Sequence, residues 1–206
     1  MRQWILSLVG LTLVASPALA GQHNRVISVG EKAPVFAGIP AAAGDKDTTL
    51  NLADIKEDVV VVVFLANHCP VVQAYEDRII DFADDYKDKN VKVVGLCVTA
   101  PGTPQYSADN LEAIKERIQD KGYNFVYGYD ETGKVGKAYG AVVTPQFFVL
   151  DKDRVIRYTG AMDDGRRGEA QVTKTPLRDA VDAVLAGETV ADTETKAFGC
   201  GVKYTR

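Results

Sequence analysis

The chain has 206 residues, a formal net charge of −4 and a hydrophobic fraction of 46%. A chain of this size is typical of one globular domain with a proper hydrophobic core. The mildly acidic balance, without a cluster of lysines or arginines, gives no support for nucleic acid or an anionic membrane as a partner, and we expect neither. Three cysteines are too few for a scaffold held together by disulfides.

The first 20 residues predict a secretory signal peptide. Arg2 gives a positive start, residues 4–14 are largely apolar, and Ala18-Leu19-Ala20 matches a small-x-small cleavage site. We expect cleavage after Ala20 and a periplasmic or extracellular location. The apolar stretch is short for a membrane span and no later stretch would serve, so we expect no span in the mature chain.

The rest of the chain predicts one domain at residues 21–187, which opens with a loose polar arm at 21–30, and an extended tail at 188–206. Inside the domain, strands and helices alternate. In chain order, the sequence predicts a hairpin turning at 41–46, a strand at 59–65, a helix at 71–87, a strand at 91–98, a helix from 109 to 121, a short strand at 124–127, a short helix at 132–139, a strand at 142–150, a strand at 155–159 and a helix at 175–187.

The spacing of apolar residues indicates the fold class. Residues 59–65 form a continuous apolar run, which is typical of a strand buried on both faces of a sheet. In residues 71–87 the spacing changes to that of an amphipathic helix. Asp109 and Glu112 resemble a capping box, and Thr175-Pro176 is a strong helix start. The order of elements predicts an α/β three-layer sandwich, with a mixed central sheet and helices on both faces.

Cys69 follows the apolar strand directly, and Pro70 begins the helix after it. The first turn of a helix offers unpaired N–H groups and the positive end of the macrodipole, which stabilise a thiolate, the reactive form of cysteine. We therefore predict that Cys69 is a reactive thiol; the alternative is a small buried apolar residue. The Thr144-Pro145 joint would return to the same rim if its strand runs antiparallel to the first.

The other two cysteines differ in their surroundings. Cys97 ends the second apolar strand, and we expect it to be buried. Cys200 lies between Gly199 and Gly201 on a polar tail that we expect to be mobile. In an oxidising compartment, one disulfide and one free thiol is a possible state.

These features together resemble the thioredoxin-like redoxin family, which includes peroxiredoxins and extracytoplasmic thiol-disulfide oxidoreductases. The resemblance covers residues 28–204 and is closer to a bacterial exported subgroup. It depends on Asn67-His68-Cys69-Pro70, Tyr75-Glu76-Asp77-Arg78, Thr144-Pro145, Gly160-Ala161-Met162-Asp163-Asp164 and Phe198-Gly199-Cys200. It implies a thioredoxin-like fold, and protein thiols, protein disulfides or peroxide as substrates. It also implies that Thr144 and Pro145 belong to the site, with Pro145 as a cis-proline facing the thiol; the alternative is a trans proline that begins an edge strand.

The chain departs from the family at Ala66, where relatives carry the first cysteine of Cys-x-x-Cys. Ordinary dithiol exchange cannot run within this motif. A peroxiredoxin would carry Thr or Ser at the same position, and alanine lacks that hydroxyl. A single thiolate could still be oxidised to sulfenic acid and captured by a second thiol, either Cys200 or Cys97.

Two interpretations of function remain open. The first is an exported redox protein, either a thiol-disulfide oxidoreductase or a peroxiredoxin-like antioxidant, with Cys69 reactive, Cys200 as a possible resolving thiol and His68 and Arg78 as possible support. The second is a thioredoxin-fold binding module that has lost catalysis. A metal carrier is less favoured, because His23 and His68 are the only histidines, and we expect neither a metal nor another cofactor.

Overall fold

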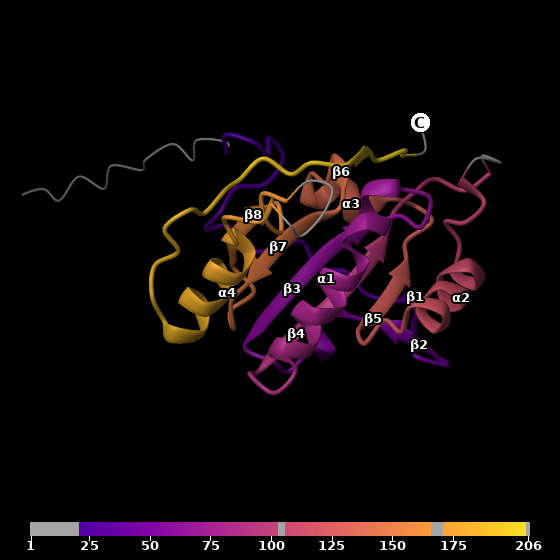
Figure 1. The fold of residues 1–206 in the computed structure, drawn as a ribbon, viewed down its shortest axis with the longest axis horizontal. Coiled ribbons are helices and arrows are strands. Elements are labelled where there is room, and N and C mark those ends of the chain that lie inside the picture. The colour runs from indigo at the N-terminus through magenta and orange to yellow at the C-terminus, as the bar shows by residue number, and fades with distance from the viewer. Residues whose placement is uncertain (1–20, 103–105, 166–170, 205–206) are drawn as a thin grey trace, which may run out of the picture.

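The centre of the molecule is strand β3 (Val59–Leu65), whose seven residues are all buried (Figure 1). In this computed structural model the described residues are 21–102, 106–165 and 171–204. The expected signal peptide at 1–20 lies outside them. The elements are β1 (Ile39–Ala43), β2 (Lys46–Leu50), the 3-10 helix η1 (Leu52–Asp54), β3, α1 (Pro70–Tyr86), β4 (Val91–Cys97), α2 (Leu111–Lys121), β5 (Val126–Tyr129), α3 (Lys134–Tyr139), β6 (Val143–Thr144), β7 (Gln146–Leu150), β8 (Ile156–Gly160), α4 (Pro176–Ala186) and β9 (Cys200–Gly201).

Seven of the strands form one mixed sheet, in the order β2-β1-β5-β4-β3-β7-β8. Strands β3, β4 and β5 run parallel, whereas β7 runs antiparallel to β3. Alternate residues of β3 face two cores, since a strand projects successive side chains to opposite faces. Val61 and Val63 pack with residues of α1, α2 and α4, and Val60 and Val62 pack with residues of α3 and the N-terminal segment. The predicted α/β class, with helices on both faces of a mixed sheet, is confirmed.

The strand predicted at residues 142–150 is two strands. Pro145 separates β6 from β7, and the Thr144–Pro145 peptide bond is cis. Strand β7 stays in the main sheet, while β6 pairs with β9 in a separate two-stranded sheet. The proline explains the break, because it lacks the N–H group that a ladder needs.

Both ends of the domain are more firmly attached than the sequence predicts. The arm at 21–30 is not loose: Asn24 is buried and donates to the carbonyl oxygen of Tyr139 at 2.8 Å. Its neighbour Gln22 donates a backbone N–H to Glu194 of the tail. The tail itself crosses the top of the sheet and ends beside β6 (Figure 1). The described part of the tail therefore follows a defined path along the domain.

Two predicted helix starts differ in detail. Helix α2 is capped by Asn110, whose side chain accepts from the Ala113 N–H at 3.0 Å, and Asp109 lies before the cap. Thr175 precedes α4 but makes no capping hydrogen bond with its side chain. No helix among the described residues is long and apolar enough to cross a membrane.

Candidate functional site

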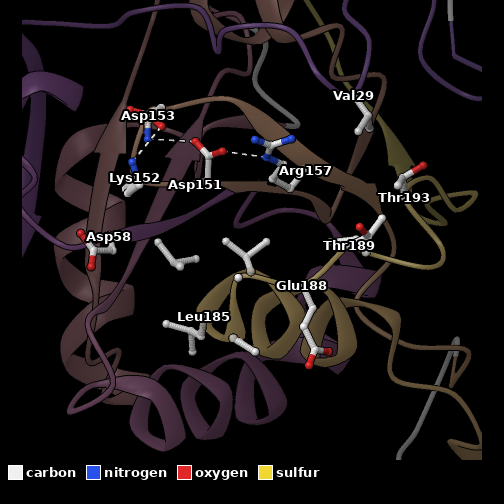
Figure 2. Close-up of a pocket in the computed structure, with 15 residues that line it drawn as sticks. Val29, Asp58, Asp151, Lys152, Asp153, Arg157, Leu185, Glu188, Thr189 and Thr193 are labelled. Atoms are coloured by element: carbon white, nitrogen blue, oxygen red, sulfur yellow. Dashed lines mark hydrogen bonds and ion pairs between the residues drawn. The ribbon is translucent and has the colours of Figure 1, made fainter.

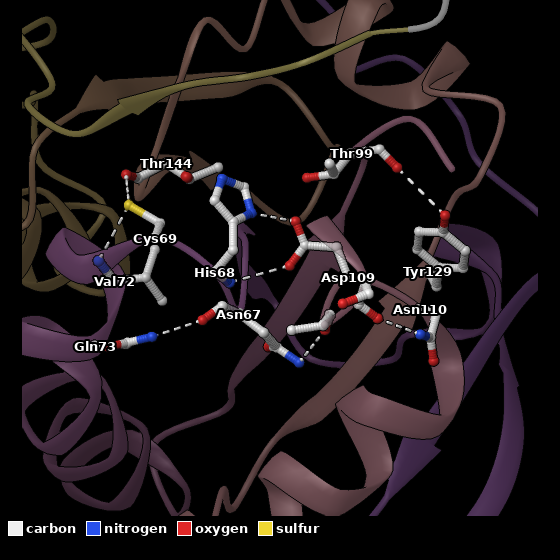
Figure 3. A network of polar contacts seen from close by, with 12 residues as sticks. Asn67, His68, Cys69, Val72, Gln73, Thr99, Asp109, Asn110, Tyr129 and Thr144 are labelled. Atoms are coloured by element: carbon white, nitrogen blue, oxygen red, sulfur yellow. Dashed lines mark hydrogen bonds and ion pairs between the residues drawn. The ribbon is translucent and has the colours of Figure 1, made fainter. Parts of the chain in front are cut away.

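Cys69 lies at the joint between β3 and α1, as the sequence predicts. It is the N-cap of α1, and its sulfur accepts a hydrogen bond from the Val72 N–H at 3.5 Å. The thiol also donates to the carbonyl oxygen of Thr144 at 3.2 Å (Figure 3). The side chain is completely buried. The sulfur therefore faces both a helix N-terminus and the residue before Pro145.

The antiparallel direction of β7 explains this meeting. Gln146, the first residue of β7, pairs with Phe64 near the end of β3. The cis Thr144–Pro145 joint is therefore brought back to the rim where Cys69 lies. Thr144 contacts the Cys69 sulfur through its main-chain oxygen and not through its side chain.

Cys200 comes to the same place from the tail. In the ladder of β6 with β9, Thr144 pairs with Cys200 and Val143 pairs with Gly201. Burial, a hydrogen bond with the Cys69 thiol and the charge of Cys69 raise the pKa of Cys200 to about 11. A hydrogen bond from the Val71 backbone acts in the opposite direction and lowers this pKa, but its effect is smaller. All three cysteines are free thiols in this structure. We call Cys69, Thr144, Pro145 and Cys200 the thiol site.

Gly199 lies unusually close to this site. A Cβ atom at this position would collide with the carbonyl oxygen of Thr144 and would lie 3.1 Å from the nitrogen of Pro145. By contrast, a Cβ at Gly201 would meet only the Val142 oxygen, at 4.0 Å. The approach of the tail to β6 thus requires glycine immediately before Cys200 but not after it.

His68 has a partner that the sequence does not reveal. Its Nδ1 atom contacts the carboxylate of Asp109, and its backbone N–H donates to the other oxygen of the same group at 3.2 Å (Figure 3). Because an ionised carboxylate only accepts, Nδ1 carries the proton. The ring also packs on Tyr106, with 4.5 Å between centroids. The side chain of Asp109 is completely buried, and its contacts fix the orientation of His68.

Cys97 is close in the sheet but chemically different. It pairs with Leu65 at the end of the β3–β4 ladder and is completely buried. Burial and the charge of Asp109 raise the pKa of Cys97 to about 12. A thiol with so high a pKa is unreactive at neutral pH. The prediction of a buried strand cysteine is confirmed.

Arg78 is not brought to the thiol site. Its guanidinium donates to Asp163 at 2.5 Å and to the carbonyl oxygen of Gly165 at 3.0 Å, and it lies 3.8 Å above the ring of Tyr75. Both partners of the ion pair are buried. These contacts attach the segment after β8 to α1, which is a structural role.

A cavity of about 650 Å³ lies away from the thiol site. It is lined by Val59, at the opposite end of β3 from Cys69, and by residues of both charges such as Lys152 and Glu188 (Figure 2). Arg157 pairs with Asp151 at its edge, at 2.7 Å. No cysteine lines it. In the described part of the chain, no group of three or more His, Cys, Asp or Glu is arranged to hold a metal ion.

Two solved structures resemble this chain in sequence and fold. A hypothetical protein from Sinorhizobium meliloti 1021 is 34% identical, with a TM-score of 0.78 over 87% of this chain and 96% of that one. An uncharacterized conserved protein from Geobacillus kaustophilus is 32% identical, with a TM-score of 0.80 over 93% of this chain and 98% of that one.

A curated relative, thiol-disulfide oxidoreductase ResA from Bacillus thuringiensis subsp. konkukian, is 25% identical over 128 residues. The match covers 62% of this chain and 66% of ResA, just under two thirds of its length. The sheet and helices form the thioredoxin-like α/β fold, which structural neighbours of lower identity share. The Redoxin family model matches residues 28–175, well over half of the chain, and this protein therefore belongs to the Redoxin family.

Proposed function

We propose that this protein is an exported thiol-disulfide oxidoreductase in which Cys69 attacks the substrate and Cys200 resolves the product. The observation that carries the proposal is that Thr144 contacts both cysteines: its carbonyl oxygen accepts from the Cys69 thiol at 3.2 Å, and Thr144 pairs with Cys200 in the ladder of β6 with β9. The tail thus offers the second thiol that the motif lacks at Ala66.

The reaction proceeds in two exchange steps. The Cys69 thiolate attacks one sulfur of a protein disulfide, that S–S bond breaks, and the leaving sulfur takes up a proton. Cys200 then loses its proton and attacks the Cys69 sulfur, which releases the second substrate sulfur as a thiol. The substrate disulfide is reduced to two thiols, and the Cys69 and Cys200 thiols are oxidised to one disulfide. An external dithiol of the compartment restores the starting state.

The environment of Cys69 supports the first step. The Val72 N–H donates to the sulfur at the N-terminus of a 17-residue helix, where partial positive charge favours an anion. His68, adjacent to Cys69 and oriented by Asp109, adds positive charge when it is protonated. The similarity to the thiol-disulfide oxidoreductase ResA supports protein disulfides over peroxide as the substrate class.

Export supports the same chemistry. The signal-peptide pattern at residues 1–20 would deliver the chain to an oxidising compartment, where a disulfide formed in catalysis persists until it is reduced. There a partner protein with disulfides is the expected substrate.

The test is insulin reduction with a dithiol as electron donor, measured for wild type, Cys69→Ser, Cys200→Ser and Cys97→Ser. We expect wild type and Cys97→Ser to be active, and both other variants to fall to background. Equal background rates in all four would support the alternative, a redoxin-fold binding module without catalysis. Activity in the Cys200→Ser variant equal to wild type would remove Cys200 from the mechanism while keeping Cys69. Peroxide consumption, measured for the same four proteins, tests the alternative of a peroxiredoxin-like antioxidant.

A further inference from the structure

We propose that residues 199–201 form a displaceable lid over Cys69, and that they hold the edge of β6 to which an extended, cysteine-containing segment of a protein substrate binds. This inference rests on the proposed function and adds how the substrate reaches the thiol. The lid residues are defined as Gly199, Cys200 and Gly201.

The burial of Cys69 requires such a movement. Its side chain is completely buried, whereas Cys200 is only partly buried. In thiol-disulfide exchange the attacking sulfur must contact the disulfide that it breaks. A completely buried Cys69 therefore cannot react with the disulfide of another protein until the site opens. Cys200 packs directly against the core cluster that contains Cys69. The tail is thus the part of the chain that covers the thiol from this side.

The lid is attached by a short ladder between two firmer points. Before it, the Thr195 N–H donates to the Thr159 carbonyl oxygen at 3.0 Å. The last hydrogen bond of the ladder itself runs from the Val202 N–H to the Val142 oxygen, at 3.0 Å. Beyond it, the Tyr204 hydroxyl donates to the Ala141 oxygen at 2.6 Å. A strand of two residues between such points can open locally without unfolding of the domain.

The contact that the lid makes defines the chemistry of the partner. When β9 leaves, Val143 and Thr144 present unpaired main-chain groups, to which an extended peptide can add as a strand. A cysteine placed opposite Thr144 then meets Cys69 as Cys200 does now. In this register the residue before that cysteine must lack a Cβ, as Gly199 does. The site therefore favours segments with Gly-Cys over segments with a larger residue before the cysteine.

The two glycines of the lid supply the test. Gly199→Ala places a methyl group on the Thr144 oxygen and should release the lid, whereas Gly201→Ala has room and should not. Cys69 modification by iodoacetamide at neutral pH is followed by mass spectrometry in the full chain. Hydrogen exchange at the Val202 N–H reports release of the lid, and thermal unfolding confirms that each variant is folded. A third measurement compares mixed-disulfide formation with activated Gly-Cys-Gly and Ala-Cys-Gly peptides.

We expect Gly199→Ala to raise the rates of Cys69 modification and Val202 exchange at least about tenfold, with Gly201→Ala close to wild type. In Gly199→Ala we also expect the Gly-Cys-Gly peptide to react faster. Equal Cys69 rates in all three proteins, or full protection of Val202 in Gly199→Ala, would overturn the lid and leave the proposed function intact. Rapid Val202 exchange with an inert Cys69 would instead contradict the proposed function itself. Equal reaction of the two peptides would overturn the preference for Gly-Cys.

Discussion

Thr144 and Cys200 face each other across a two-residue antiparallel ladder, and the carbonyl oxygen of Thr144 also accepts the hydrogen bond of the Cys69 thiol. Two thiols separated by 131 positions in the sequence, at 69 and 200, therefore share one site. Position 66 is alanine, so the stretch around Cys69 holds one cysteine, and the tail brings Cys200 beside Thr144.

Removal of Cys200 should trap the substrate. In Cys200→Ser the Cys69 thiolate can still attack a disulfide, but no neighbouring thiol can release the product. We expect a Cys69-linked mixed disulfide to accumulate with a protein substrate under non-reducing electrophoresis. The matched control is Cys97→Ser, which removes a buried thiol and should not accumulate the adduct. Accumulation in both variants, or in neither, would contradict the role of Cys200.

The titration of Cys200 should depend on Cys69. Burial, the hydrogen bond with Cys69 and the charge of Cys69 raise the pKa of Cys200 to about 11. Cys69→Ala removes the last two causes, so the pKa of Cys200 should fall toward its ordinary value, and alkylation of Cys200 should reach its half-maximal rate at lower pH. Iodoacetamide rates measured between neutral and alkaline pH report this midpoint. A midpoint that stays the same in Cys69→Ala would mean that the thiols do not interact; Cys97→Ser should leave it unchanged.

Asp109 should matter for stability and Glu112 should not. Asp109→Ala leaves the His68 ring and backbone N–H without their buried acceptor, a loss of about 1–3 kcal/mol in the free energy of unfolding. Glu112→Ala changes only an exposed side chain that pairs with Lys115. Urea unfolding of both variants measures the loss in the free energy of unfolding that each substitution causes. If Glu112→Ala were the more damaging change, the capping box expected from sequence would hold after all.

Arg78 should support the fold and not the chemistry. Arg78→Met leaves the buried Asp163 charge unpaired, which costs about 3–5 kcal/mol in the free energy of unfolding. Below its unfolding temperature, the folded variant should modify Cys69 at the wild-type rate. Lys87→Ala, which breaks an exposed pair with Asp84, serves as the surface control and should leave stability unchanged. A selective loss of Cys69 reactivity in folded Arg78→Met would restore Arg78 to the site.

Local patterns in the sequence predict most of the fold. The apolar run of β3 and the helical spacing of α1 indicate the Cys69 joint correctly, because both periods act over neighbouring residues. The short β5 is found two residues later than predicted, at Val126–Tyr129. A largely apolar stretch of nine residues at 142–150 predicts one strand and conceals the change of sheet at Pro145, since nothing in the local pattern shows that β6 and β7 have different partners.

The site is less predictable, because its contacts join distant segments. Asp109 lies 41 residues from His68, and its local spacing to Glu112 gives a plausible but incorrect role. Cys200 is predicted as the possible resolving thiol, since Cys97 is expected to be a buried strand residue. The pairing of β9 with β6, which brings Cys200 beside Thr144, is not visible in the sequence. The close approach of Gly199 to the Thr144 oxygen is not visible in the sequence, apart from the glycines that flank Cys200.

The most direct test is peptide mapping of the oxidised protein. The full chain is treated with a mild thiol oxidant, the remaining thiols are blocked, and the peptides are analysed without reduction. The account predicts one internal disulfide, between Cys69 and Cys200, with Cys97 recovered as a free thiol. A disulfide between Cys69 and Cys97, or an oxidised Cys69 with Cys200 still free, would contradict it.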